Sequence, residues 1–480
     1  MEIRKVLTDS GVSLFRKFVL FARGILVVPI ITKLLGVDIY GIWTLIFSFI
    51  AIFGGVGGLH LHGTLVRYTP SEDRKGQTVS DLLLIALFTA AIAGFAFPLL
   101  IEYIGFSTPA KSMLGLSVPV IAAMIIVAKI IGGILKNIPR AENRVKKFEI
   151  ISLAEKTLET VALLTILTVT QNIAAGLLAI LGSMLVVYTA IFFLYIPDRL
   201  RKPEPDNFKR YLTYSTPMIF NDFSNQMLSH TDKFVILYFF SPVQVGIYSV
   251  AYGVSVLFPT LTSMFNSTLY PSVTSAWEND EMTDVRRFYR NFLEGYVLLV
   301  IPVLFGITLL ASPILRVLAT EQVATEGWIL VPILTFGFIF RGYENVITYV
   351  LNAAEATEKV AIGTSLAFLT NLVLNLALIP AIGIKGAAIA MMISMVVRMS
   401  YIYYHVRTYV SVPIPKGRLA KSVFSSVVMV ALLLYIGFNP VQEIVKIVLY
   451  PIVGAMTYFA VVFTIGGLTT KDIRRMKSML

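Results

Sequence analysis

Long apolar stretches alternate with short polar segments along the whole chain, and most of these stretches are long enough to cross a bilayer. A spanning helix needs roughly 20 mostly apolar residues, because each residue advances only a short distance through the hydrocarbon. Residues 82–103, 113–135 and 161–181 meet that length, and residues 423–438 come close. The pattern predicts an all-α polytopic membrane protein with about fourteen transmembrane helices. The predicted spans are 13–35, 39–64, 80–104, 113–137, 148–170, 173–196, 211–239, 243–269, 291–312, 328–352, 360–380, 385–406, 421–438 and 446–467.

The composition supports this class and argues against an enzyme. The chain is 56% hydrophobic and 14% charged, with a mean hydropathy of +0.79. The loops between the predicted spans are short, so no soluble domain remains to hold a catalytic site. The sequence has no cysteine, and its four histidines are scattered; the pair His60 and His62 lacks the further ligands of a metal site. We therefore expect no enzymatic activity, no metal site and no bound cofactor.

The net charge of +12 would suggest nucleic acid as a partner of a soluble protein, but its distribution gives a different explanation. Loops on one side of the predicted membrane carry about 26 lysines and arginines, and those on the other side carry about 5. The positive-inside rule makes the rich side cytoplasmic, so both termini are expected in the cytoplasm. The natural partners of these basic loops are anionic lipid headgroups, and no nucleic acid is expected.

Residues 197–210 contain three prolines and dense charge, which is typical of a stiff linker. They follow the sixth predicted span and divide the chain into two lobes of six helices and a final pair. The predicted domains are an N-terminal lobe at 1–196, a cytoplasmic linker at 197–210, a C-terminal lobe at 211–408, and two last helices with a tail at 409–480.

A weak internal repeat supports the two lobes. Gly41, in a segment reading Tyr-Gly-Ile-Trp, aligns with Gly246 at an offset of about 205, and the Ala-Ala-Gly segment around Gly176 aligns with the one around Gly386 at about 210. Both lobes begin on the same side, so they would form a parallel repeat about an axis along the membrane normal, which is a transporter signature. The alternative is that small-residue turns recur in any helical membrane protein.

The same segments resemble a known family. The opening of the chain, with Leu35-Gly36, Tyr40-Gly41-Ile42-Trp43 and Leu65-Val66-Arg67-Tyr68, is similar to that of polysaccharide-biosynthesis flippases of the O-antigen repeat-unit type. The second half carries Thr231-Asp232-Lys233-Phe234 and Val245-Gly246-Ile247-Tyr248, and later Ile384-Lys385-Gly386-Ala387-Ala388. The match covers nearly the whole chain in order. The wider superfamily that it implies is that of the multidrug, oligosaccharidyl-lipid and polysaccharide exporters.

The resemblance implies a fold like that of the multidrug-and-toxin extruders and a function in cell-surface polysaccharide assembly. The expected activity is the alternating-access transfer of a polyprenyl phosphate- or pyrophosphate-linked oligosaccharide from the cytoplasmic to the outer leaflet of the cell membrane. The alternatives are a flippase of the lipid II type and an ion-coupled multidrug exporter. The implied partners are the lipid-linked substrate, membrane lipids and the polysaccharide polymerase machinery. A monomer is expected, because the substrate path lies between lobes of one chain.

Several arginines lie at mid-membrane depth, where a charge facing lipid costs roughly 2.5–3.5 kcal/mol. Arg16 and Arg23 are seven residues apart and lie on one helix face, while Arg341 and Arg398 lie deep in later spans. If the resemblance holds, the cargo brings phosphate into the membrane, and arginine pairs bidentately with phosphate oxygens. We predict that these four side chains line a cavity and bind the headgroup. The alternative is that they tie helices together.

Three carboxylates are candidates for ion coupling, with H⁺ and Na⁺ both left open. Asp222 lies in a polar patch with Asn221 and Gln226, which suggests exposure to the cavity. Asp232 is followed by Lys233 and is as well explained by a local salt bridge. Glu344 lies three residues after Arg341, which makes an intrahelical pair of these two residues a further interpretation.

Other charges and glycines within the spans have structural explanations. Lys136 lies near a helix end and is expected to extend to the interface, whereas Lys129 and Lys156 are expected to pair with Glu155 and Glu159. The alternative for Lys129 and Lys156 is a contact with the substrate. The glycines at residues 54–58 fit either close helix packing or a flexible point, and we favour packing.

Overall fold

The computed structural model describes residues 23–71, 75–105, 114–197, 199–256, 258–259, 266–411, 415–436 and 443–469. Within these ranges the regular structure is helical, with no strand. Ten helices are long and apolar enough to cross a membrane. The chain separates into two compact units, Met1–Gly246 (unit 1) and Ile247–Leu480 (unit 2). The all-helical membrane fold is confirmed, while the lobes predicted on either side of residues 197–210 stay a prediction.

The predicted count of fourteen spans also stays a prediction, for a physical reason. A described helix lies within every predicted span, but those within 13–35, 148–170, 211–239 and 243–269 are not among the ten. The helix at 148–170 carries several charges, the one at 211–239 is rich in polar side chains, and the one that begins near 243 is short. Composition alone therefore does not identify these helices as membrane spans.

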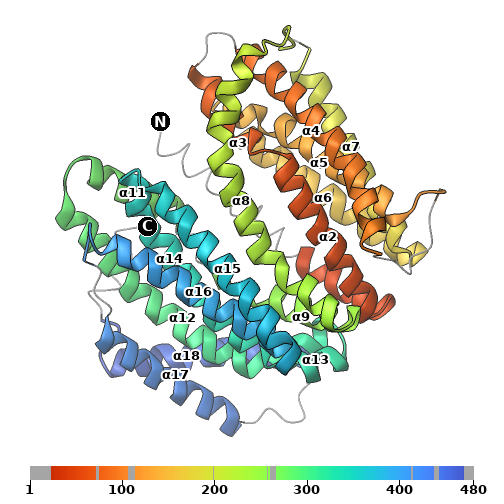
Figure 1. The fold of residues 1–480 in the computed structure, drawn as a ribbon. Helices are drawn as coiled ribbons and strands as arrows, with labels where there is room; N and C mark the ends of the chain where they lie inside the picture. The colour runs from red at the N-terminus through yellow and green to blue at the C-terminus, as the bar shows by residue number, and fades with distance from the viewer. Residues whose placement is uncertain are drawn as a thin grey trace. The chain divides into compact units, whose positions relative to one another are not determined.

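Unit 1 is a helical bundle built around one central helix (Figure 1). Its helices are residues 23–34, α2 (Val37–Gly57), α3 (Leu61–Tyr68), α4 (Lys75–Tyr103), α5 (Val118–Ala141), α6 (Val145–Thr170), α7 (Ile173–Tyr195), α8 (Asp206–Phe239) and the start of α9 (Pro242–Ser255). The central helix is α5, which packs against α2, α3, α4, α6 and α7. By contrast, α4 leaves Phe88 and Phe95 68% and 74% exposed on one face, as expected of a helix that faces lipid.

The predicted span at 39–64 is interrupted in the structure. Helix α2 ends at Gly57 and α3 begins at Leu61, and Leu59 and His60 between them have φ angles of 45° and 54°. A non-glycine residue in this left-handed region costs about 1–2 kcal/mol. The interpretation of the 54–58 glycines as packing residues alone is therefore incomplete, because the run also ends a helix inside the predicted span.

The predicted linker is attached to unit 1 by one buried carboxylate. Asp81 on α4 is fully buried; its Oδ1 accepts hydrogen bonds from Gln77 Nε2 (2.9 Å) and the backbone nitrogen of Glu204 (2.8 Å). Its Oδ2 accepts from Asn207 Nδ2 at 3.0 Å. Nearby, Arg199 donates to Glu142 at 2.8 Å. These hydrogen bonds therefore hold the segment against unit 1. Helix α8 starts within the segment, at Asp206.

Replacing Asp81 by alanine is expected to destabilise the protein by about 2–4 kcal/mol, because hydrogen bonds to a charged acceptor contribute about 1.5–3 kcal/mol each and their buried donors would be left without a partner. Chemical unfolding in detergent, followed by circular dichroism, measures the change. The control is Asp206→Ala in the same segment, where the exposed side chain should matter by no more than about 0.5 kcal/mol. Equal stability of the two variants would contradict the role given to Asp81.

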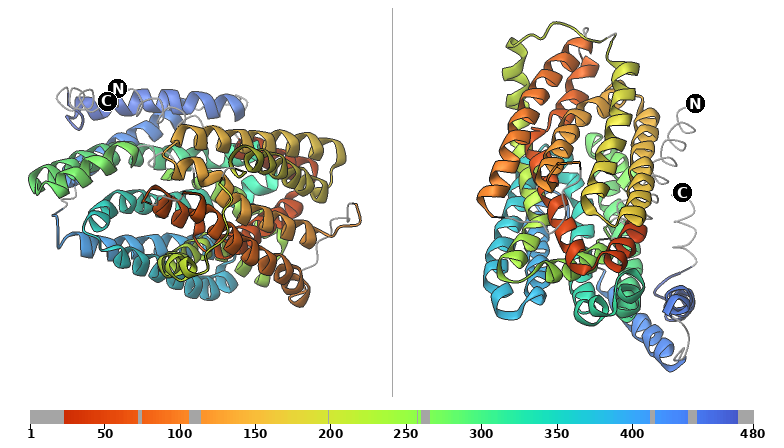
Figure 2. Two further views of the ribbon diagram at one scale, coloured as in Figure 1. Left: turned by 90° about the horizontal axis from the view of Figure 1, so that it is seen from above. Right: turned by 90° about the vertical axis from the view of Figure 1, so that its right-hand side faces the viewer.

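Unit 2 packs its helices around α12 and α14. Its helices are the rest of α9, α11 (Asn266–Glu278), α12 (Met282–Leu318), α13 (Glu321–Gly327), α14 (Leu330–Ala353), α15 (Thr357–Ile382), α16 (Ile384–Val406), α17 (Lys416–Ile436) and α18 (Glu443–Thr464). The pairs α14–α16 and α15–α16 are the most extensive, while α17 and α18 pack on α12 and on each other. The last two helices therefore lie on the outside of this unit, as Figures 1 and 2 show.

Candidate functional site

Two buried carboxylates on α6 organise the charges of unit 1. Glu155 and Glu159 are each 1% exposed. Lys136 on α5 donates to Glu155 Oε2 at 3.0 Å, and the hydroxyl of Tyr188 on α7 donates to Oε1 at 2.8 Å. A buried carboxylate is tolerated only with such partners. Lys136 therefore forms an ion pair with Glu155, and its extension to the interface stays a prediction.

Glu159 is the second centre of the same network. Arg23 Nη1 donates to its Oε2 at 3.0 Å, and Lys156 Nζ lies 2.8 Å from its Oε1. The ion pair expected for Lys156 is confirmed. Arg23, which we predicted to bind a headgroup, thus already shares its charge with a carboxylate. A phosphate at Arg23 would have to compete with Glu159 for the guanidinium.

Lys129 is the cation of this region that has no such partner, so the ion pair predicted for it is wrong. It lies on α5, seven residues before Lys136 and hence on the same helix face, and its side chain is exposed. Its Cδ packs against Gly54 of α2. Among the residues that the structure describes, no carboxylate lies within ion-pair distance of its ammonium group. With Arg23, Lys136 and Lys156 there are four cations for two carboxylates, so this face of unit 1 carries excess positive charge.

A histidine and an aspartate meet at the break between α2 and α3. His60 Nδ1 lies 2.7 Å from Oδ2 of Asp222 on α8, and the His60 ring lies 4.8 Å from that of His62. The side chains of His60 and Asp222 are 20% and 36% exposed. This contact ties α8 to the broken helix.

Unit 2 has a simpler charge cluster between α14 and α16. Arg398 Nε lies 3.3 Å from Glu344 Oε2, and the two side chains are 8% and 1% exposed. The hydroxyl of Thr348 donates to Glu344 Oε1 at 3.0 Å. The intrahelical pair predicted between Arg341 and Glu344 is wrong, because Glu344 faces the arginine of the neighbouring helix. Arg341 lies near both residues, half-buried, and the described part of the chain gives it no carboxylate within ion-pair distance.

The remaining predicted residues are separated from these clusters or lie outside the described ranges. Asp232 on α8 is 1% exposed, and the neighbouring Lys233 donates to the carbonyl of Ser229 at 3.2 Å. Asp232 is thus far less accessible than Asp222. Arg16 lies outside the described residues. Neither the contact of His60 with Asp222 nor the absence of an ion pair at Lys129 was predicted from the sequence. The available signals were the glycine run before His60 and the absence of a carboxylate one turn from Lys129 on its own helix.

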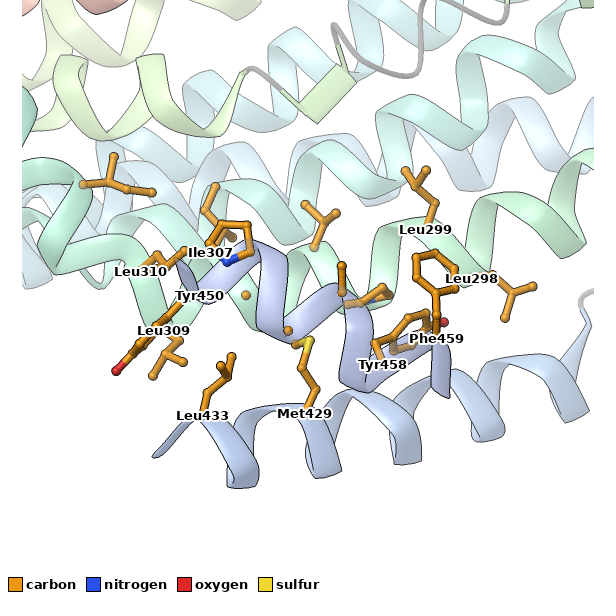
Figure 3. Close-up of a pocket in the computed structure, with 17 residues that line it drawn as sticks. Leu298, Leu299, Ile307, Leu309, Leu310, Met429, Leu433, Tyr450, Tyr458 and Phe459 are labelled. Carbon is orange, nitrogen blue, oxygen red and sulfur yellow. The ribbon is translucent and has the colours of Figure 1, made fainter. Parts of the chain in front are cut away.

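Apolar pockets are found on unit 2. One pocket of about 350 Å³ lies between α12, α17 and α18, where Leu298, Met429, Leu433 and Tyr458 surround it (Figure 3). A second, of about 770 Å³, is more open and includes Trp328 and Phe336. Their linings are almost wholly apolar, so they suit hydrocarbon chains rather than headgroups.

Comparison with known proteins agrees with this architecture. Residues 30–325 match the model of a family described as polysaccharide biosynthesis protein. A probable flippase of Haloferax volcanii, AglR, is 28% identical over 254 residues, which are 52% of this chain and 53% of that protein. A probable low-salt glycan biosynthesis flippase of the same organism is 25% identical over 260 residues, which are 54% of this chain and 55% of that protein. The chain thus matches about half the length of these curated relatives.

Solved structures extend the similarity of the fold to almost the whole chain. A lipid II flippase, MurJ, in an inward closed conformation, gives a TM-score of 0.74 at 18% identity, covering 95% of this chain and 98% of that one. An inward-facing multidrug resistance transporter of the MATE family and the MOP superfamily gives 0.67 at 15% identity, covering 82% and 94%. At such identities the likeness concerns the fold. The family model matches more than half of the sequence, and the chain belongs to the polysaccharide biosynthesis protein family.

Proposed function

We propose that the chain is a flippase that moves a polyprenyl phosphate- or pyrophosphate-linked oligosaccharide from the cytoplasmic to the outer leaflet of a cell membrane. Two relatives are named as probable flippases, one of them in glycan biosynthesis. The charge asymmetry of the loops supports cytoplasmic termini. A phosphate that crosses the hydrocarbon needs cations at membrane depth. On the α5–α6 face of unit 1, cations outnumber carboxylates, so positive charge is present for such a group.

The observation that carries this proposal is the presence of an unpaired cation in each unit. Lys129 and Arg341 lie within spanning helices, and among the described residues neither has a carboxylate within ion-pair distance. A cation without a partner is costly within the membrane, so a site that keeps one has an anion to bind. In each unit, this cation is therefore the primary candidate for phosphate binding. Arg23 and Arg398, which already face carboxylates, hold secondary places.

The other features of the structure take consistent roles in this proposal. The hydrocarbon tail of the substrate does not contact the cations. The apolar pockets of unit 2 have the chemistry to receive part of this tail. Asp222, with His60 at 2.7 Å, is the preferred coupling group, because Asp232 and Glu344 are almost fully buried. One chain holds all of these groups, so the working unit is a monomer.

The test is translocation of a fluorescent polyprenyl-pyrophosphate oligosaccharide in proteoliposomes that contain the full chain. Lys129→Gln is expected to reduce the initial rate roughly tenfold to a hundredfold, because a hydrogen bond to a charged group contributes about 1.5–3 kcal/mol. The matched control is Lys385→Gln, where an exposed lysine at the start of α16 is replaced in the same way. The control should transport at the wild-type rate.

Two outcomes would overturn the proposal in different ways. Equal rates for Lys129→Gln and Lys385→Gln, at equal amounts of folded protein, would remove Lys129 from the site. A wild-type chain that leaves the lipid in place but moves a cationic dye would be a multidrug exporter, and the phosphate site would be wrong as a whole.

A further inference from the structure

Helix α8 carries a continuous polar face inside its predicted span. Polar residues recur at helical spacing between positions 221 and 233, so they lie on one half of the helix surface. They are Asn221, Asp222, Asn225, Gln226, Ser229, His230 and Lys233. Within a membrane such a face needs another helix, water or a ligand as its partner, because lipid tails offer it no hydrogen bond. The contacts of this face therefore indicate which of its residues remain for a ligand.

One row of the polar face is used for helix packing within unit 1, where α8 packs along α2 and α3. Asp222 contacts the break between α2 and α3. Gln226 Nε2 donates to the carbonyl of Ala51 at 3.2 Å, and His230 Nδ1 lies 2.9 Å from the hydroxyl oxygen of Ser48. Residues at this spacing of four lie above one another on a helix, so the row supports the fold.

The neighbouring row, which consists of Asn221, Asn225 and Ser229, has a different pattern of contacts. Asn225 Nδ2 donates to the carbonyl of Asn221 at 3.0 Å, and the Ser229 hydroxyl donates to the carbonyl of Asn225 at 2.9 Å. In the part of the chain that the structure describes, the side chains of Asn221 and Ser229 form no hydrogen bond to another helix. All three residues are partly exposed. Since polar side chains in membranes usually bond across helices, this row keeps hydrogen-bonding capacity for a ligand.

The chemistry of this row matches the hydroxyl groups of a sugar. A side-chain amide offers both donors and an acceptor, and a serine hydroxyl can do either. Sugar hydroxyls likewise donate and accept, whereas a phosphate only accepts hydrogen bonds and is bound best by cations. The row is uncharged and extends over two helical turns, about 12 Å along the axis, which is long enough for more than one sugar ring.

The row lies close to the lysine proposed for phosphate binding. Gly54 and Gly55 are consecutive residues of α2. A Cβ atom on Gly54 would lie 3.0 Å from Lys129 Cδ on α5, and one on Gly55 would lie 3.2 Å from Gln226 Nε2 on α8. Both side chains therefore reach the same short segment of α2. Because Gln226 directly follows Asn225, the row and the proposed phosphate ligand of unit 1 are near each other.

We propose that Asn221, Asn225 and Ser229 bind sugar hydroxyls of the lipid-linked oligosaccharide, an inference that rests on the proposed transport function. Lys129 recognises the phosphate, which all polyprenyl-linked glycans share. The row on α8 recognises the sugar, which distinguishes one such lipid from another. These three residues therefore contribute to the choice of substrate, whereas the cations do not.

Binding of two lipids to the full chain in nanodiscs tests this assignment. One probe is a fluorescent polyprenyl-pyrophosphate oligosaccharide, and the other is the same polyprenyl pyrophosphate without sugar. Asn221→Leu and Ser229→Ala should each weaken binding of the first probe by about threefold to tenfold, the effect of one neutral hydrogen bond, and should leave the second unchanged. Lys129→Gln should weaken binding of both probes. The control Thr216→Val, at an exposed position on the opposite face of α8 from Asn225, should change neither.

A thiol in the row provides a second measurement if a variant folds poorly. The chain has no cysteine, and Ser229→Cys replaces the hydroxyl by a thiol of similar size. The glycosylated probe should slow labelling of this thiol by a maleimide several-fold, and the sugar-free probe should not. Equal affinity of the wild type for the two probes, wild-type affinity of both row variants for the glycosylated probe, or equal protection of the thiol by the two probes would overturn the sugar site. A wild-type chain that binds neither probe would instead overturn the proposed function, and the sugar site with it.

Discussion

Replacement of Glu155 by alanine is expected to destabilise the protein by about 3–5 kcal/mol, among the largest single effects that this structure predicts. The carboxylate is 1% exposed and accepts from Lys136 at 3.0 Å and from the Tyr188 hydroxyl at 2.8 Å. Without it, Lys136 becomes an uncompensated cation beside Lys156, and the buried Tyr188 hydroxyl loses its acceptor. Unpaired charges within packed helices cost more than the pair itself contributes.

Thermal unfolding of the purified protein in detergent measures this effect, with Glu358→Ala as the control. Glu358 is exposed in the first turn of α15, so its removal should change the stability by no more than about 0.5 kcal/mol. Glu155→Gln should lie between the two, because the amide keeps an acceptor for Tyr188 but cannot neutralise Lys136. A Glu155→Ala protein as stable as the control would show that the network does not support the fold.

The order of the long apolar helices follows from the sequence because apolar length is a local property. A stretch such as residues 82–103 must be helical in a membrane, whatever packs on it, since no other structure satisfies its backbone there. The break at Leu59 and His60 is different. A glycine run is compatible with a tight helix crossing and with a helix end, and only the packing of α2, α3 and α8 decides between them.

The charge partners were predicted less well, because pairing is a property of facing helices. Lys156 and Glu159 are three residues apart on one helix, and their ion pair could be predicted. The same rule gave the wrong partner for Glu344, which faces Arg398 on α16 rather than Arg341 on its own helix. Residue depth identified the arginines, but it could not show which of them are already neutralised. Lys129 was predicted to pair with Glu155 or Glu159, which in the structure pair with Lys136 and Lys156 instead.

Partner assignment divides the membrane-embedded cations into two chemical groups. Arg23, Lys136, Lys156 and Arg398 each lie within 3.3 Å of a carboxylate oxygen and are largely neutralised. A neutralised pair holds helices together but attracts a phosphate weakly. Among the described residues, Lys129 and Arg341 have no carboxylate within ion-pair distance. We therefore expect different results when individual cations are replaced. Loss of a paired cation should change the stability of the protein, whereas loss of an unpaired cation should change transport.

Arg398 and Glu344 provide the sharpest case. Glu344→Leu should destabilise the protein by about 3–5 kcal/mol, because it removes the buried carboxylate that lies close to both Arg398 and Arg341. Arg398→Met should cost less, since Arg341 remains near Glu344. The double variant should recover most of the loss from Glu344→Leu, because a buried pair replaced by apolar side chains of similar volume is often nearly neutral.

Transport by the same proteins then separates a structural role of Arg398 from phosphate binding. If Arg398 only ties α14 to α16, the double variant should move the fluorescent lipid at a rate close to that of the wild type. Arg341→Gln should show the opposite pattern, with stability changed by less than about 1 kcal/mol and transport reduced roughly tenfold or more, because it removes an unpaired cation rather than a pair. A stable double variant without transport would restore Arg398 to the phosphate site, and an Arg341→Gln protein with full transport would remove Arg341 from it.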